Sequence, residues 1–292
     1  MKDFTGKTAV ITGAGSGMGR YLAVLLAKAG ANVAICDINE ETLNGTATMV
    51  RQYNVAVSTH IVDMGDMERI ETLPEEVVAR HGAVDLVFNN AGVTVGSSFA
   101  GMPEQDWDWV MNINLNGVVK ATRVFLPLLK DRPEAAIVNT SSIFGMITVA
   151  GQSVYHATKF GVRGFTESLA KEFKDTAVQV HCVHPGHIGT NIIANAKFNE
   201  EDEGFLQQDN VDVDEMANMF RTRGMHPSRA AEIILNGVKR NKRRIFVGLD
   251  AKLMDLAQRI TPMHYEGLLP LINVPLYFLR NRRPLKDLPE EP

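Results

Sequence analysis

Residues 8–19 read TAVITGAGSGMG, an apolar run that passes directly into a glycine-rich turn. The run predicts a buried strand, and a helical pattern starts at Gly17. Glycine permits positive φ and lets backbone amides approach a ligand, and the N-terminus of the following helix favours a negative charge. The spacing is T-G-x-x-x-G-x-G, whereas the common G-x-G-x-x-G would need glycine at position 18. The turn therefore predicts a pyrophosphate cradle formed by Gly13, Gly15, Ser16, Gly17, Met18 and Gly19.

The rest of the chain repeats this alternation of short apolar strands with longer helical patterns. Further strands are predicted at 32–36, 55–62, 84–88, 136–140, 179–183 and 244–247. Helices are predicted at 17–29, 40–53, 67–80, 107–130, 152–173 and 228–239. Nearly all-apolar strands separated by helices predict a parallel sheet that is covered on both faces. The expected fold class is α/β, a doubly wound, Rossmann-like three-layer sandwich with a parallel sheet of about seven strands.

The composition is that of an ordinary globular protein. Of the 292 residues, 45% are hydrophobic and 22% are charged, which is enough to bury a sizeable core. The net charge of −4 gives no reason to expect nucleic-acid binding. Cys36 and Cys182 lie in apolar strand patterns, which predicts buried free thiols in a reducing compartment. The early first strand and the lack of a long apolar segment lead us to expect a cytoplasmic protein.

Asp37 stands where the second predicted strand ends, and Ile38 follows it. A carboxylate at this point can accept both hydroxyls of an adenosine ribose and would repel a 2′-phosphate. No lysine or arginine that would attract this phosphate occurs at Ser16, Ile38 or Asn39. Asp37 and Ile38 are therefore predicted to bind the adenosine of NAD, and NADP is disfavoured. Asp37 also fits a helix N-cap beside Asn39, and both roles are compatible.

Asp63 and Met64 follow the third predicted strand. At this position the Asp63 carboxylate could contact the adenine amine, with Met64 beside it. Aspartate is also typical of a tight turn, and Gly65 comes two residues later. Both interpretations stay open on the sequence.

Tyr155 and Lys159 are four residues apart in a helical pattern and so share one face of the helix. A tyrosine ordinarily loses its proton only near about pH 10, and a neighbouring ammonium favours the phenolate. The pair therefore predicts a group that exchanges a proton at neutral pH. Ser142 lies upstream at the end of a predicted strand. Taken alone, Ser142 could merely end a strand, Tyr155 could be a partly buried aromatic residue, and Lys159 could be a solvated surface charge.

The motifs gain weight because they occur together and in one order. They are T12-G-x-x-x-G-x-G19, N89-N-A-G92, Asn114 in N-L-N-G, Ser142, Y155-x-x-x-K159, and P185-G186 with Thr190. On these motifs the chain resembles the short-chain dehydrogenase/reductase family over about residues 5–250. The resemblance implies a seven-stranded Rossmann-like sheet and hydride transfer between NAD(P) and an alcohol or carbonyl compound. It also implies a homo-oligomer, often a tetramer, assembled through the helices predicted at 107–130 and 152–173.

The resemblance assigns a role to each of four catalytic candidates. Tyr155 would exchange the proton of the substrate oxygen, and Ser142 would hydrogen-bond that oxygen as charge develops on it. Lys159 would lower the pKa of Tyr155 and bind the nicotinamide ribose. Asn114 would hold a water that links Lys159 to solvent. In a sequence without the other motifs, Asn114 could merely mark a helix kink.

Two further motifs resemble the family's cofactor contacts. Asn90, Ala91 and Gly92 would form a wall beside the adenosine, or would alternatively brace the central sheet. The loop 185–190 would cap the nicotinamide and bind its carboxamide. Its expected contacts are Pro185, Gly186, the Ile188 amide and the Thr190 hydroxyl.

His181, His184 and His187 lie close together in the sequence and invite a metal hypothesis. Strand alternation sends His181 and His184 to opposite faces, and no H-E-x-x-H motif occurs. We therefore predict core or loop histidines and no metal site.

Two segments depart from the strand–helix alternation of a single dehydrogenase domain at 1–250. Residues 190–226 are polar and acidic and would lie near the carboxyl ends of the strands, which predicts a substrate lid or, alternatively, a surface helix. Residues 251–292 form a C-terminal extension that contains GLLPLINVPLYFLRNRRP. This segment could lie on a membrane surface, but its prolines favour packing on the domain, over the substrate mouth or on a neighbouring subunit.

Together, these features predict an NAD-dependent oxidoreductase that interconverts a secondary alcohol and a ketone. A bulky apolar substrate is expected, such as a steroid-like, terpenoid or lipid-derived alcohol. An NADP-dependent carbonyl reductase of the same family is the first alternative. The second is a scaffold that binds a dinucleotide without catalysis, which would not need all four catalytic candidates.

Overall fold

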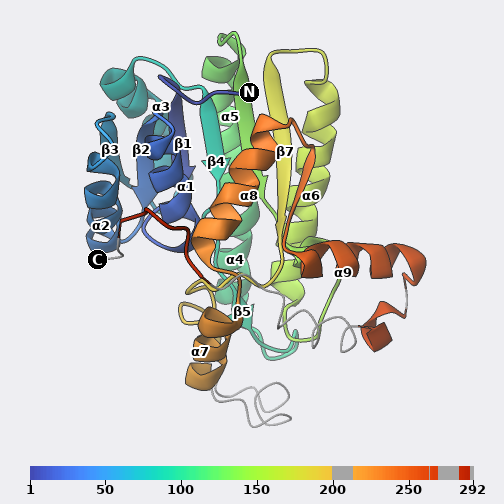
Figure 1. Cartoon of the computed structure of the whole chain (residues 1–292). Coiled ribbons are helices and arrows are strands. Elements are labelled where there is room, and N and C mark those ends of the chain that lie inside the picture. Colours follow the sequence, from blue (N-terminus) through green and yellow to red (C-terminus); the bar gives the residue numbers. More distant parts are fainter. Residues whose placement is uncertain (199–212, 263, 269–282, 290–292) are drawn as a thin grey trace.

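The protein is described by a computed structural model that covers residues 1–198, 213–262, 264–268 and 283–289. Seven strands form one sheet: β1 (Thr8–Thr12), β2 (Asn32–Asp37), β3 (Val57–Ile61), β4 (Leu86–Asn89), β6 (Ala135–Thr140), β7 (Val178–Pro185) and β9 (Arg244–Val247). Their order is β3-β2-β1-β4-β6-β7-β9, and every neighbouring pair is parallel. Helices cover the sheet (Figure 1), and the predicted doubly wound, Rossmann-like fold is confirmed.

Two apolar cores lie on opposite faces of this sheet, because successive strand residues point to opposite sides. On β1, Ile11 belongs to one core and Val10 to the other. The helices over the Ile11 face are α1 (Gly17–Lys28), α2 (Glu40–Arg51) and α8 (Pro227–Lys239). Those over the Val10 face are α3 (Met67–His81), α5 (Gly117–Lys130) and α6 (Ser153–Glu172).

The strand order places the glycine-rich turn at a special point of the sheet. From β1 the chain proceeds outward through β2 and β3, and it then crosses back to β4 on the other side of β1. Ligands of open α/β sheets bind at such a switch point, outside the carboxyl ends of the strands. The turn after β1 therefore lies where this fold forms its binding crevice.

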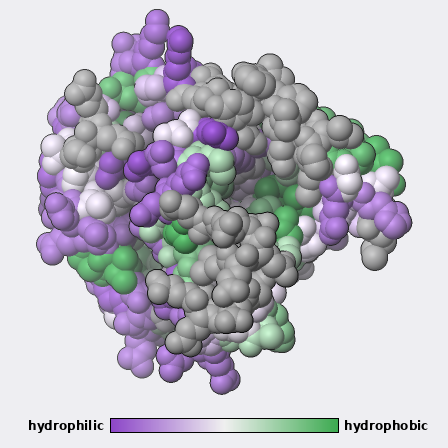
Figure 2. All heavy atoms as spheres, turned by 90° about the horizontal axis from the view of Figure 1, so that it is seen from below, coloured by the Kyte–Doolittle hydropathy of each residue, from purple (hydrophilic) through white to green (hydrophobic). Residues whose placement is uncertain are grey.

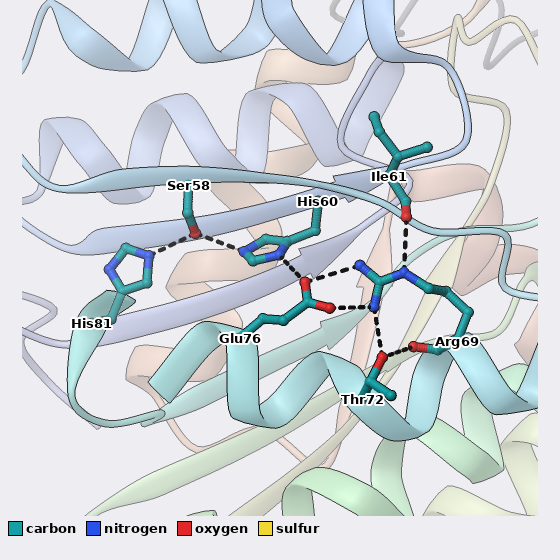
Figure 3. Close-up of polar contacts among 7 residues, drawn as sticks. All are labelled: Ser58, His60, Ile61, Arg69, Thr72, Glu76 and His81. Atoms are coloured by element: carbon teal, nitrogen blue, oxygen red, sulfur yellow. Dashed lines mark hydrogen bonds and ion pairs between the residues drawn. The ribbon is translucent and has the colours of Figure 1, made fainter. Parts of the chain in front are cut away.

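A chain of polar side chains fastens the edge strand β3 to α3 (Figure 3). The Ser58 Oγ lies 2.8 Å from the Nε2 atoms of both His60 and His81. The His60 Nδ1 lies 2.9 Å from the Glu76 carboxylate, to which Arg69 donates two hydrogen bonds of 2.7 and 2.9 Å. Burial raises the pKa of Glu76, but the hydrogen bonds and charges of Arg69 and His60 outweigh burial and lower the pKa. This network attaches an exposed strand edge to its helix.

The helix predicted at 107–130 is interrupted. The structure divides it into α4 (Glu104–Met111), a π-helical turn η1 (Asn112–Asn116) and α5. Such turns bulge the helix and are frequent at functional sites. A small second sheet of β5 (Val95–Gly96) and β8 (Lys197–Phe198) was not predicted, because two-residue strands carry no readable periodicity.

The described part of the C-terminal extension packs on the sheet domain. Its helical elements are α9 (Leu249–Ile260) and a 3₁₀ turn η3 (Tyr265–Leu268). Met254 and Tyr265 share an apolar cluster with Ile143 and Ile147, and the Tyr265 hydroxyl accepts a 2.8 Å hydrogen bond from the Thr148 amide. Most of the segment expected to contact a membrane or neighbouring subunit, 269–282, lies outside the described residues. No helix in the described ranges has the length and apolarity to cross a bilayer.

His181 and His184 both lie on β7 and are fully buried. Their Nδ1–H groups donate to the carbonyls of Lys242 (2.8 Å) and Ser142 (3.3 Å). Burial lowers the pKa of each imidazole to about 4. Among the described residues, no group of three His, Cys, Asp or Glu side chains is arranged to hold a metal.

We expect acid to destabilise the protein through these two histidines. An unfolded histidine binds a proton below about pH 6.5, whereas the folded ones bind it only near pH 4. Stability is therefore lost as the pH falls from about 6.5 to 4, by about 2 kcal/mol per histidine at pH 5. Urea unfolding at pH 7.5 and 5 should show a smaller pH effect in His181→Gln. The exposed His264→Gln serves as the control, and an unchanged pH effect in His181→Gln would contradict the expectation.

Candidate active site

The glycine-rich turn joins β1 to α1 and has little room for side chains. Gly13 has a φ of +65°, and a Cβ there would lie 2.8 Å from the Cα of Ala91. A Cβ on Gly19 would collide with the Gly13 carbonyl. Ser16 is the N-cap of α1, and its side chain makes no capping bond to the first-turn amides. The turn therefore presents close-packed backbone and an uncapped helix N-terminus, as an anion cradle requires.

Asp37 lies beside this turn at the end of β2. One oxygen of its carboxylate accepts the Gly15 amide at 2.8 Å, and the other accepts the Asn39 amide at 3.1 Å. The N-cap of α2 is Asn39, whose side chain accepts the Thr42 amide at 3.0 Å. The Asp37 side chain therefore does not cap α2 and lies against the glycine turn.

Ile38 follows the carboxyl end of β2, and Asp63 and Met64 follow that of the edge strand β3. Asp63 accepts the Gly65 amide at 2.7 Å, which is the tight turn that its sequence position suggested. Met64 is buried, and its carbonyl packs against Gly117. Ile38 is 65% exposed. The adenine and adenosine contacts of these three residues stay predictions.

The two asparagines of N89-N-A-G92 have different partners. The Asn89 Nδ2 donates to Thr122 and Asn139 and so braces the central sheet. The amides of Asn90 and Ala91 instead donate to the Thr12 Oγ1 at 3.0 and 3.1 Å, which ties the end of β4 to the glycine turn. The Asn90 Oδ1 is buried and has no hydrogen-bond partner among the residues that the structure describes. Asn89 thus braces the central sheet, whereas the wall that Asn90, Ala91 and Gly92 would form beside the adenosine stays a prediction.

Tyr155, Lys159 and Ser142 meet at the end of β6. Tyr155 and Lys159 lie on α6 and are 8% and 3% exposed, with the Lys159 Nζ 5.5 Å from the centre of the Tyr155 ring. The Lys159 ammonium also donates to the Thr140 carbonyl at 3.1 Å. The Ser142 hydroxyl lies near the Tyr155 phenol on the cavity wall, and it accepts a hydrogen bond from the Phe144 amide at 3.1 Å. Three residues that the sequence assigned to one set of motifs thus form one cluster.

The pKa of Tyr155 corrects one expectation. Burial raises it to about 12, and only the hydrogen bond from Ser142 opposes that effect. The sequence predicted a pKa lowered by Lys159. The direction is opposite because the buried phenolate would lose its hydration, and the Lys159 pKa is itself lowered by burial to about 8.

Asn114 lies at the centre of the π-helical turn and is fully buried. Its side chain accepts the Val93 amide at 2.9 Å and donates to the Val93 carbonyl at 2.8 Å. A Cβ on Gly92 would lie 3.3 Å from both the Asn114 Oδ1 and the Lys159 Nζ. Gly92 therefore borders the space between these two polar groups.

The loop after β7 crosses in front of the glycine-rich turn. The Gly186 amide donates to the Val247 carbonyl at 2.9 Å, and the Thr190 amide donates to the Ile188 carbonyl at 2.8 Å. A Cβ on Gly17 would lie 3.1 Å from the Thr190 methyl group. The loop and the turn therefore face each other across the switch point.

A cavity of about 820 Å³ opens between these elements. Figure 2 shows this side of the molecule, seen from below, with apolar surface near the centre of the view. Helix α7 (Val213–Arg223), from the segment predicted as a lid, contributes Met216, Met219 and Phe220. Asp37, Ile38, Asp63, Met64 and Asn114 do not line it. The predicted residues that do are Met18, Asn90, Gly92, Ser142, Tyr155, Lys159, Pro185, Gly186, Ile188 and Thr190.

Helix α9 contributes to the cavity wall, as expected if the C-terminal extension packs over the substrate mouth, but the sequence did not single out the two residues that do so. Asp250 and Met254 line the cavity, next to Ile143 and Ile147 of the loop after Ser142. Met254 falls on the apolar face of a helical pattern, which could have been recognised. Asp250 could not, because an acid in the first turn of a helix is common for electrostatic reasons alone.

A dinucleotide-type turn at the switch point, beside a cavity that contains a phenol, a hydroxyl and an ammonium, defines a nucleotide-dependent oxidoreductase. The family model for the short chain dehydrogenase matches residues 7–201. SadH of Mycobacterium tuberculosis, named as an oxidoreductase, is 38% identical over 272 residues, 92% of this chain and 95% of SadH. This chain therefore belongs to the short-chain dehydrogenase/reductase family.

Other relatives and solved structures agree. FabG of Thermotoga maritima, a 3-oxoacyl-[acyl-carrier-protein] reductase, is 37% identical over 185 residues, 63% of this chain and 75% of FabG. A short-chain dehydrogenase/reductase from Burkholderia phymatum in complex with NAD superposes with a TM-score of 0.79 at 25% identity, covering 99% of this chain and 100% of its own. A metagenomic short-chain oxidoreductase in complex with NADP gives 0.60 at 31% identity, covering 63% and 83%.

Proposed function

We propose that the protein interconverts a secondary alcohol and a ketone with NAD as the hydride carrier. One observation carries this proposal: the Tyr155 phenol, the Ser142 hydroxyl and the Lys159 ammonium converge in a cavity that adjoins the glycine-rich turn. These groups can bind and protonate a carbonyl oxygen, and the dinucleotide, when bound, accepts or donates the hydride.

The residues would divide the work as follows. In oxidation Tyr155 removes the proton from the substrate hydroxyl, and in reduction it returns the proton to the oxygen. Ser142 hydrogen-bonds the same oxygen as charge develops on it. Burial raises the Tyr155 pKa in the protein alone. Once the dinucleotide is bound, a cationic nicotinamide and the Lys159 ammonium together would favour the phenolate and oppose that rise. Asn114 holds a water that relays the proton to solvent.

The residues at the switch point fit a dinucleotide. The glycines at 13 and 19 leave no space for side chains, and the N-terminal amides of α1 lack a side-chain cap. A phosphate placed there would accept hydrogen bonds from these amides. The buried Asn90 Oδ1 offers a further acceptor beside the turn.

The choice of NAD depends on Asp37. Its carboxylate lies against the glycine turn, where the ribose of an adenosine would be bound. The Burkholderia structure in complex with NAD supports this choice. Titrating the protein with NADH and with NADPH, while the nicotinamide fluorescence is followed, tests it. Tighter binding of NADPH would overturn the choice of NAD.

An NADP-dependent carbonyl reductase is the second candidate. The metagenomic oxidoreductase in complex with NADP and the similarity to FabG, which is named as a reductase, favour it. A panel of alcohols with NAD⁺ and of ketones with NADPH distinguishes the two functions. Failure of every pair, despite tight dinucleotide binding, would instead support a non-catalytic scaffold.

The cavity supports a bulky, apolar substrate. Its walls include Met216, Met219 and Phe220 of α7, which we propose acts as a substrate lid, and Met254 of the C-terminal extension. A substrate such as a steroid-like, terpenoid or lipid-derived alcohol would bury its apolar surface against these side chains. Turnover should therefore improve as the hydrocarbon part of the alcohol grows.

We further infer a homo-oligomer, a tetramer or a dimer, formed through α4–α5 and α6. Phe160 on α6 is 39% exposed, which is consistent with a contact on this helix. Light scattering coupled to gel filtration would measure the mass of the assembly. A monomer at micromolar concentration would contradict this inference.

A further inference from the structure

Asp250 carries the contact between the C-terminal extension and the loop 185–190. It lies in the first turn of α9 and is only 4% exposed. One carboxylate oxygen accepts the His187 amide at 2.9 Å, and the other accepts the Ala251 amide at 2.9 Å. The bond to His187 joins positions 63 residues apart. Asp250 therefore bonds to a distant loop as well as to the next amide of its own helix.

Two glycines make room for this carboxylate. A Cβ on Gly186 or on Gly248 would collide with the Asp250 Oδ1. Gly248 also has a φ of +108°, which only glycine adopts readily. The backbone on both sides is thus shaped around the acid. Burying a charge is costly unless its hydrogen bonds are made, so this position has a specific requirement for aspartate.

His187, whose amide donates to Asp250, also contacts the α7 region. Its ring Nε2–H donates to the Phe220 carbonyl of α7 at 2.8 Å, and its ring centre lies 4.2 Å from that of Phe220. Its carbonyl accepts the Met225 amide at 2.9 Å. The backbone from Gly186 to Ile188 is therefore held by Asp250 on one side and by the α7 region on the other.

We propose that Asp250 is a positioning residue for the nicotinamide end of the dinucleotide. It fixes the position of the Gly186–His187 backbone. This backbone in turn fixes the positions of the Ile188 amide and the Thr190 hydroxyl that follow. The proposal rests on the proposed function, since it assumes that a dinucleotide lies along the glycine-rich turn. Asp250 acts through the loop and does not itself exchange a proton with the substrate.

A ligand pair separates positioning from general stability. ADP-ribose contains the adenosine and pyrophosphate of NADH but lacks the nicotinamide. In Asp250→Asn, the side chain keeps one acceptor oxygen and presents an NH₂ group to the second amide, which displaces the loop. We expect binding of NADH to weaken about tenfold and that of ADP-ribose to stay within about twofold. The KM for NAD⁺ should rise more than kcat falls.

Asp255→Asn is the matched control, because Asp255 lies on the same helix and pairs with Arg259 at 2.9 Å. NADH fluorescence and calorimetry with ADP-ribose, at equal folded fraction, provide the measurements. Equal weakening of both ligands in Asp250→Asn, or no weakening of either, would overturn the positioning role. If wild-type protein binds neither ligand, the proposed function itself fails, which is a distinguishable result.

A second variant keeps the proposal testable if Asp250→Asn does not fold. Gly186→Ala leaves the acid in place and pushes the loop away from it, because the new methyl group meets the carboxylate. Gly164→Ala on α6 is its control, since nothing lies within 4 Å of a Cβ there. The same selective loss of NADH binding is expected in Gly186→Ala only, and an equal loss for ADP-ribose would contradict the proposal.

Discussion

Tyr155→Phe is expected to reduce turnover about 1,000-fold while NADH binding stays within about twofold. The substitution removes only the hydroxyl, so the edge-to-face contact of the ring with Phe144, at 6.2 Å, is retained. The phenol is the group placed to exchange a proton with a substrate oxygen, because it lines the cavity beside the Ser142 hydroxyl and the Lys159 ammonium. Absorbance of NADH formed from NAD⁺ and an accepted alcohol measures turnover, and nicotinamide fluorescence measures binding.

Tyr53→Phe is the matched control, because it removes a partly buried phenol at the C-terminal end of α2, which does not line the cavity. It should leave both measurements unchanged. Undiminished turnover in Tyr155→Phe would be incompatible with the proposed chemistry. A parallel loss of NADH binding would instead indicate damage to the fold, and a thermal melt of the variant distinguishes that case.

Replacing Asp37 with serine and Ile38 with arginine is expected to reverse the cofactor preference. Removing the carboxylate ends the repulsion of a 2′-phosphate, and a guanidinium at the 65% exposed position 38 can bind that phosphate. The ratio of NADPH to NADH affinity should rise about 100-fold. Titrations of the double variant with both nucleotides measure the ratio.

Asp37→Asn tests which property of the carboxylate matters. In the unsubstituted protein the Gly15 amide donates to the Asp37 carboxylate at 2.8 Å. Asparagine keeps an oxygen that can accept this bond but loses the negative charge. The ratio of NADPH to NADH affinity is therefore expected to lie between that of the unsubstituted protein and that of the double variant. Asp63→Asn is the control, because adenine is common to both nucleotides and the ratio should not change. A double variant that still prefers NADH would show that Asp37 does not determine the choice.

The local pattern of the sequence was sufficient for most of the fold. All seven strands of the sheet were predicted, because apolar β-branched runs are a property of neighbouring residues. Their boundaries moved by at most two residues, as at β3 and β7. The π-helical turn around Asn114 was not predicted as such. It breaks a helix whose hydrophobic pattern runs on without a proline or glycine before Gly117.

The candidate site was predicted in part. Sequence order alone placed Ser142, Tyr155 and Lys159 in one motif set, and the structure brings them together. The direction of the Tyr155 pKa shift was wrong, because burial depends on every element that packs around the phenol. Asp250 was overlooked for the same reason: its partner His187 is remote in the sequence.

The amino-acid sequence by itself determined the seven strands, the glycine-rich turn and the order of the polar motifs, because each of these is a property of residues close together in the chain. Only the tertiary structure decided which charges are desolvated and how α7 and α9 close the cavity. It also decided from which backbone amide each buried carboxylate accepts a hydrogen bond. These properties arise from contacts between residues far apart in the chain, and a linear pattern carries no signal for them.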